Sequence, residues 1–169
     1  MTHLWTPWRS TYMQAKKDHS RCIFCEAAAS TSDEEYLVVY RGMLSFILLN
    51  RYPYTSGHLM IAPYEHVARL RETSEASSNE IMRLTRRAEE VLEELYRPAG
   101  LNLGMNLGEA AGAGVAQHIH MHVLPRWQGD ANFMTTVGQT RVIPEALEDT
   151  YAKLKGRFAP EPAPPHGTI

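Results

Sequence analysis

Short apolar runs separated by turn residues fill the middle of the chain. They are of strand length and lie at 36–40, 44–49, 58–62, 101–107 and 118–124. The first three are rich in β-branched and aromatic residues, and Arg41-Gly42 divides the first two, which indicates a hairpin. The last run alternates regularly, and Pro125 is expected to end it. The pattern therefore predicts about five strands, largely antiparallel.

Two other segments have the spacing of helices. One carries a stripe of apolar side chains that step by three and four, at positions 81, 84, 88, 91, 92 and 95. This stripe predicts a long helix that begins after Ser77 or Ser78 and ends near Tyr96. Residues 144–155 predict a second helix with proline in its first turn, and residues 27–35 are expected to form a loop. The predicted fold is α+β, a five-stranded, mainly antiparallel sheet with one long helix and a second, C-terminal helix.

Length and composition indicate one domain. The chain has 169 residues, of which 44% are hydrophobic. We expect an N-terminal arm over 1–21, a single domain over 22–158 and a proline-rich tail, extended or disordered, over 159–169. The net charge of −2 disfavours nucleic acid or an anionic membrane as a partner. No apolar run is long enough for a transmembrane helix, and the N-terminus lacks a signal pattern, so a cytoplasmic location is expected.

Three histidines at alternate positions are the most informative feature of the sequence. His118, His120 and His122 would share one side of the predicted strand, about 6–7 Å apart, because successive side chains alternate between the faces of a strand. One imidazole can attack a reacting atom while its neighbours orient it, bind a metal or donate to a leaving group. The alternatives are a bare metal site and a strand that is polar only on its wet face. Strict alternation disfavours the latter.

A glycine- and alanine-rich segment, residues 106–117, leads directly into these histidines. Such a turn lets backbone N–H groups approach an anion closely and hold a phosphate. An imidazole that attacks phosphorus forms a covalent phosphorus–nitrogen intermediate. The residues alone therefore predict a histidine nucleophile for phosphoryl or nucleotidyl transfer.

The run His118-x-His120-x-His122 resembles the signature of the histidine triad family of nucleotide hydrolases and transferases. The similarity covers roughly residues 22–127. It includes the segments 49–63, 106–108 and 124–127. Within the family, residues 5–9 and 125–133 look most like bacterial diadenosine tetraphosphate phosphorylases and hydrolases.

The resemblance implies a role for each matching residue. His120 would be the nucleophile that takes the nucleoside monophosphate from the α-phosphate, and His122 would lie against the phosphate and assist. Asn106 would contact phosphate or ribose, and Asn50 would lie by the nucleoside.

The phosphate loop departs from the family's pattern. Where members commonly carry Gln and then Ser or Thr, this sequence has Gly114 and Val115, and its nearest glutamine is Gln117, directly before His118. We expect backbone N–H groups from Gly112 to Val115 to take the place of those side chains.

The pair Cys22-x-x-Cys25 has three interpretations: a redox pair, two unrelated buried thiols, or half of a tetrahedral zinc site. A redox pair normally opens a helix after a strand, which disfavours it here. The resemblance implies the zinc site and completes it with His66 and His118. Four protein ligands leave no open position, so one structural zinc ion per chain is expected.

The favoured function is an enzyme that cleaves a nucleoside 5′-phosphoryl bond of a dinucleoside polyphosphate or related nucleotide through a nucleotidyl-His120 intermediate. Water as acceptor would make it a hydrolase, and inorganic phosphate a phosphorylase. The alternatives are a nucleoside phosphoramidase and a zinc-stabilised nucleotide-binding module with weak catalysis. An open sheet edge and the family likeness predict a homodimer or higher homo-oligomer.

Overall fold

The computed structural model describes residues 21–131 and 145–158. The predicted arm, except Arg21, and the predicted tail lie outside these ranges. In chain order the elements are α2 Ile23–Ala29, α3 Asp33–Tyr36, β1 Val38–Arg41, β2 Ser45–Leu49, β3 Leu59–Pro63, η1 Leu70–Glu72, α4 Glu75–Tyr96, β4 Gly100–Met105, η2 Glu109–Ala111, β5 Met121–Arg126 and α6 Leu147–Leu154. None of the helices within the described ranges is long and apolar enough to cross a membrane.

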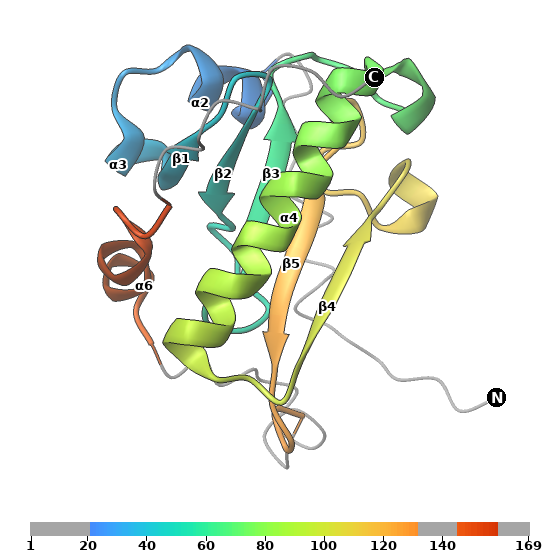
Figure 1. Cartoon of the computed structure of the whole chain (residues 1–169). Coiled ribbons are helices and arrows are strands. Elements are labelled where there is room, and N and C mark those ends of the chain that lie inside the picture. The colour runs from blue at the N-terminus through green and yellow to red at the C-terminus, as the bar shows by residue number, and fades with distance from the viewer. Residues whose placement is uncertain (1–20, 132–144, 159–169) are drawn as a thin grey trace, which may run out of the picture.

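Five strands of the described chain form one sheet in the order β1-β2-β3-β5-β4, and every neighbouring pair is antiparallel (Figure 1). The α+β fold class predicted from the pattern is confirmed. The central register places Met60 of β3 and Gly104 of β4 on either side of His122. The histidine run therefore enters the sheet between β3 and β4.

The long helix α4 covers one face of the sheet, where it crosses β2, β3 and β5 (Figure 1). Its stripe of apolar residues forms the main core with inward residues of those strands, such as Ile47, Ile61 and Val123. The helix begins at Glu75, earlier than predicted, because the Ser74 side chain accepts the Ser77 N–H at 3.1 Å and caps the first turn.

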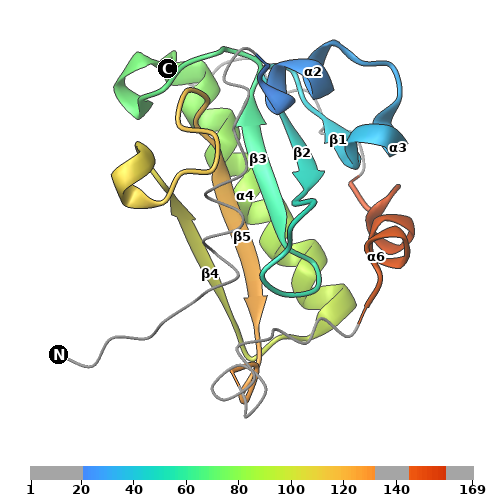
Figure 2. The ribbon, with the colours of Figure 1, turned by 180° about the vertical axis from the view of Figure 1, so that it is seen from behind.

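The opposite face carries the short helix α2 at one end of the sheet (Figure 2). Phe24 and Ala27 of α2 pack there in a second, smaller cluster with strand residues such as Phe46 and Met60. The expected loop over 27–35 is wrong, because its first residues end α2 and its later ones form α3. Three consecutive alanines favour the helix, and burial of Ala27 fixes its face.

Two predicted element ends also differ from the structure. Strand β5 continues through Pro125, which lies opposite Leu101 on β4. The pairing of β3 ends at Val123, so the missing N–H of Pro125 leaves no partner unsatisfied on that side. The last helix begins at Leu147 rather than at 144, a position outside the described residues.

Candidate active site and metal centre

All three histidines of the run are buried, with exposed fractions of 0% for His118, 4% for His120 and 8% for His122. The alternative of a polar strand face in contact with water is therefore wrong. Only His122 lies within β5, which begins at Met121. The rings of His120 and His122 are 4.7 Å apart between centroids, closer than the predicted spacing, because the backbone before Met121 is not a regular strand.

The hydrogen bond of His120 fixes which of its nitrogens is free for chemistry. Its Nδ1 lies 3.0 Å from the backbone oxygen of His118. A carbonyl oxygen only accepts hydrogen bonds, so Nδ1 carries the proton and Nε2 keeps its lone pair. Burial lowers the pKa of His120 from 6.5 to about 4, with a smaller contribution from His122, so the imidazole is neutral at pH 7. This is the state that a nitrogen nucleophile requires.

A fourth histidine, His58, completes a chain of imidazoles. Its Nε2 lies 2.9 Å from Nδ1 of His122, and its Nδ1 accepts the backbone N–H of Tyr54 at 3.2 Å. Nδ1 of a neutral His58 is thus the acceptor, so Nε2–H donates to His122. Nδ1 of His122 must then be unprotonated, and its proton lies on Nε2. Burial lowers the pKa of His122, which favours this neutral form, an Nε2–H donor.

His58 lies outside the alternating histidine run, and its spacing in the sequence does not single it out. It is fully buried at the end of the turn before β3, and the pairing of β3 with β5 brings it to His122. The signal was its place inside the 49–63 segment that matches the histidine triad pattern. Its partner, His122, could not be recognised from the sequence because it lies 64 positions further along the chain.

Asn50 also belongs to this network. Its side-chain Nδ2 lies 3.3 Å from Nδ1 of His58, and its Oδ1 accepts the Tyr52 N–H at 2.9 Å. The structure therefore brings Asn50 to the imidazole chain. Beside it, the Tyr54 ring lies 6.2 Å from the His122 ring and lines a cavity of about 1150 Å³.

The glycine-rich loop leads from β4 to the histidine run. Asn106 directly follows β4, whose last residue, Met105, pairs with Met121 of β5. The N–H of Gly112 is already used, donating to the Glu109 carbonyl at 2.9 Å in the turn of η2.

The other loop candidates differ in exposure. Gly114 and Val115 are half-buried, Val115 packs against the smaller cluster, and Gln117 is exposed. The backbone cradle expected over Gly112–Val115 is not formed by its first two N–H groups, because those of Gly112 and Ala113 donate to the Glu109 and Gly108 carbonyls in the turn.

The four predicted metal ligands come together at the start of α2. The ligand atoms of Cys22, Cys25, His66 and His118 all lie within 4.8 Å of one another. Nδ1 of His118 is 3.4 Å from the Cys22 sulfur and 3.6 Å from the Cys25 sulfur, and Nδ1 of His66 is 3.1 Å from the Cys25 sulfur. Tetrahedral zinc with ordinary bond lengths separates S and N ligands by about 3.6 Å. Two soft sulfurs and two imidazoles at this spacing fit a structural zinc ion.

The surroundings of the cluster suit a metal as well. Nε2 of His118 lies 2.9 Å from the Pro63 carbonyl and so carries the proton, which leaves Nδ1 as the ligand atom. Burial and the neighbouring Cys22 thiol raise the pKa of Cys25 to about 11. A bound cation would favour the thiolate instead.

Comparison with known proteins gives a consistent picture. Residues 32–129 match the HIT domain family. The chain is 43% identical to a protein named AP-4-A phosphorylase from Mycobacterium tuberculosis H37Rv, over 96% of this chain and 87% of that protein. It is 30% identical to the asymmetrical bis(5′-nucleosyl)-tetraphosphatase of Schizosaccharomyces pombe, over 55% of this chain and 50% of that protein.

Solved structures agree on the fold. A HIT family protein from Bacillus subtilis has a TM-score of 0.59 at 27% identity, covering 83% of this chain and 99% of that one. A zinc-bound histidine triad family protein from Mycobacterium smegmatis has a TM-score of 0.64 at 24% identity, covering 82% of this chain and 94% of that one.

The five-stranded sheet and its buried histidines define a histidine triad protein, and the chain belongs to the HIT domain family. It is an enzyme of this family, similar over most of its length to the mycobacterial AP-4-A phosphorylase.

Proposed function

We propose that this enzyme cleaves dinucleoside polyphosphates such as diadenosine tetraphosphate at an α-phosphate, through a covalent nucleotidyl-His120 intermediate. The observation that carries the proposal is the hydrogen bond from His120 Nδ1 to the His118 carbonyl, which leaves the Nε2 lone pair of a buried, neutral imidazole for attack. The names of the two relatives, a phosphorylase and a tetraphosphatase of dinucleotides, support the substrate class.

Nucleotidyl transfer to the enzyme is the first step. Nε2 of His120 attacks the α-phosphorus, the bond from phosphorus to the bridging oxygen breaks, and the leaving nucleotide takes that electron pair. The imidazole becomes a cation, and its Nδ1–H bond to the His118 carbonyl stabilises the new charge. The Nε2–H of His122 is the donor for a non-bridging phosphate oxygen, on which negative charge is held.

Transfer to an acceptor completes the cycle. An acceptor oxygen attacks the α-phosphorus, the phosphorus–nitrogen bond breaks, and its electron pair returns to Nε2 of His120. We propose inorganic phosphate as the acceptor, on the name of the relative that is 43% identical. Asn106 and the backbone of Gly114 and Val115 would hold the phosphates, Gln117 would lie at the rim, and Asn50 would hold the nucleoside.

We propose one structural zinc ion per chain at Cys22, Cys25, His66 and His118. The donor set and its spacing support this. When bound, the ion would supply a cross-link between α2, the segment after β3 and the histidine run, with no open position for catalysis.

We also propose that the protein works as a homodimer in the cytoplasm. Strand β4 is an edge of the sheet, with one side unpaired within the described chain and Leu103 48% exposed, which suits a second copy. Two free cysteines arranged as metal ligands suit a reducing compartment.

Incubation with diadenosine tetraphosphate, with and without inorganic phosphate, tests the function. ADP plus ATP formed only with phosphate means phosphorolysis, and AMP plus ATP means hydrolysis. His120→Ala should abolish turnover, while Met121→Leu, next in the chain but directed to the α4 face, should keep it. If the wild-type protein releases neither product pair, the proposal is wrong.

A further inference from the structure

Phe24 lies between the metal cluster and the proposed nucleophile. Its side chain is fully buried, and its ring centroid is 5.1 Å from the His118 ring and 4.7 Å from the His120 ring. In sequence it stands between Cys22 and Cys25, on the first turn of α2. Any movement of α2 therefore moves an aromatic ring that rests on the His120 imidazole.

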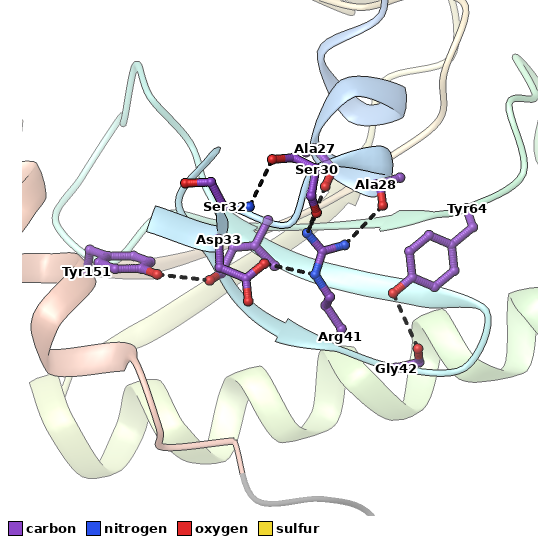
Figure 3. A network of polar contacts seen from close by, with 10 residues as sticks. Ala27, Ala28, Ser30, Ser32, Asp33, Arg41, Gly42, Tyr64 and Tyr151 are labelled. Atoms are coloured by element: carbon purple, nitrogen blue, oxygen red, sulfur yellow. Dashed lines mark hydrogen bonds and ion pairs between the residues drawn. The ribbon is translucent and has the colours of Figure 1, made fainter. Parts of the chain in front are cut away.

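The C-terminal end of α2 is held by one arginine of the sheet. Figure 3 shows the Arg41 guanidinium below the end of the helix, where it donates to the carbonyls of Ala27, Ala28 and Ser30 at 2.8, 3.2 and 2.9 Å. Its Nε bonds Asp33 at 2.8 Å. Carbonyls at a helix end lack partners within the helix, so a planar, multiply donating cation suits this place.

At the N-terminal end of α2, Arg21 donates to the Glu26 carboxylate at 2.7 Å, on the exposed side of the helix. The cap residue Cys22 makes no side-chain capping hydrogen bond. The Cys22 sulfur lies near the His118 imidazole, and the Cys25 sulfur near that of His66. This end of the helix is thus held through the metal-ligand cluster, and the other end through Arg41.

We propose that α2 is a positioning element for His120 and that Phe24 is the positioning residue, held against the His120 ring by the Cys/His cluster at one end of the helix and by Arg41 at the other. The inference rests on the proposed function, because it assigns His120 as the nucleophile.

Besides the His122 ring, whose centroid is 4.7 Å away, two contacts restrain the His120 ring. The bond from Nδ1 to the His118 carbonyl fixes one edge but permits rocking about that bond. The Phe24 ring closes one face of the imidazole and limits the rocking. His118 links the metal-ligand cluster to His120, because its Nδ1 belongs to the cluster and its carbonyl accepts the hydrogen bond from His120. Small displacements of a reacting group lower the rate by large factors, so a restraint on the His120 ring should raise the rate of attack.

The test replaces the Phe24 ring without emptying its place. Phe24→Met fills much of the volume with a flexible chain, and Phe158→Met, a buried phenylalanine of the other core cluster, is the matched control. In metal-loaded protein with equal metal content, Phe24→Met should lower kcat for diadenosine tetraphosphate cleavage at least about tenfold and leave KM within about threefold. Phe158→Met should change neither by more than about twofold. Equal effects of the two variants, or a raised KM with unchanged kcat, would overturn the proposal.

Nuclear magnetic resonance of the resting protein gives a second readout that needs no turnover. The His120 ring signals, identified by their loss in His120→Ala, should shift in Phe24→Met and stay in place in Phe158→Met, because the aromatic ring next to the imidazole is gone. Failure of wild-type turnover would refute the proposed function and leave this measurement to test the contact between Phe24 and His120 on its own. If Phe24→Met does not fold, the same signals are compared in metal-loaded and chelated wild type. Unshifted signals there would overturn the role of the cluster.

Discussion

Removing His58 tests whether the imidazole chain sets the proton of His122. His58→Leu keeps much of the side-chain volume but removes both ring nitrogens. It leaves Nδ1 of His122 and the Tyr54 N–H without their partner, and the amide of Asn50 loses one as well. A buried polar group without a partner costs about 1–3 kcal/mol, so the loss of stability should be about 2–5 kcal/mol. In a chain of this length that lowers Tm by roughly 5–15 °C.

The catalytic effect should be separable from the loss of stability. Without the Nε2–H of His58, neutral His122 is free to carry its proton on either nitrogen, and its donor to the phosphate is no longer assured. Preorganised donors of this kind are worth about 10²–10³ in kcat, so partial loss should lower kcat about 10–100-fold. His58→Gln restores an N–H donor for His122 but not the acceptor for Tyr54. It should recover kcat more than Tm.

Steady-state kinetics with diadenosine tetraphosphate and thermal unfolding of the two variants provide the comparison. If His58→Leu keeps kcat within about twofold of wild type, the proton of His122 does not depend on His58. Equal kcat values for the Leu and Gln variants would refute the reasoning as well.

Three further predictions concern stability. Glu80 is 3% exposed and accepts the Met43 and Leu44 N–H groups at 3.0 and 2.6 Å, so Glu80→Gln should cost about 1–3 kcal/mol by urea unfolding, while exposed Glu90→Gln should change little. A chelator should lower Tm of metal-loaded wild type but leave Cys25→Ser unchanged, because that variant lacks a ligand. The pKa of His120 falls from 6.5 to about 4 on folding, so below pH 6.5 protons bind the unfolded chain preferentially. The free energy of unfolding should therefore decrease from pH 7 toward pH 4. A free energy of unfolding that stays constant over this range would contradict the prediction.

The sheet and long helix were predictable because their side chains follow local patterns. The run that becomes β3 is apolar throughout, that of β2 is apolar after Ser45, and the stripe of α4 repeats every three or four residues. The helix α2 was not predictable in this way. Its seven residues hold two buried side chains, Phe24 and Ala27, too few for a visible period, and its end depends on Arg41, a residue of β1.

Part of the candidate site was likewise predictable from the sequence, and part needed the fold. Residue types at fixed spacing pointed to the histidine run and to the cysteine pair. The resemblance to the histidine triad family added the role of His120 and the ligands His66 and His118, and the folded chain brings the four ligands together. The role of His58 and the contact of Phe24 with His120 needed the structure. Both depend on which strand pairs with which, and on the side of the sheet that α2 covers, and neither is a local property of the sequence.

Main-chain groups fix the proton of every imidazole in the histidine run, directly or through one neighbour. The Pro63 carbonyl sets His118, the His118 carbonyl sets His120, and the Tyr54 N–H sets His122 through His58. Carboxylate partners would have favoured the imidazolium form, whereas neutral amides and burial favour the neutral ring. A neutral ring can attack phosphorus or donate one hydrogen bond according to which nitrogen carries the proton. A chain with a net charge of only −2 can therefore act on a polyanion, because its site relies on the direction of a few N–H groups and one lone pair rather than on positive charge.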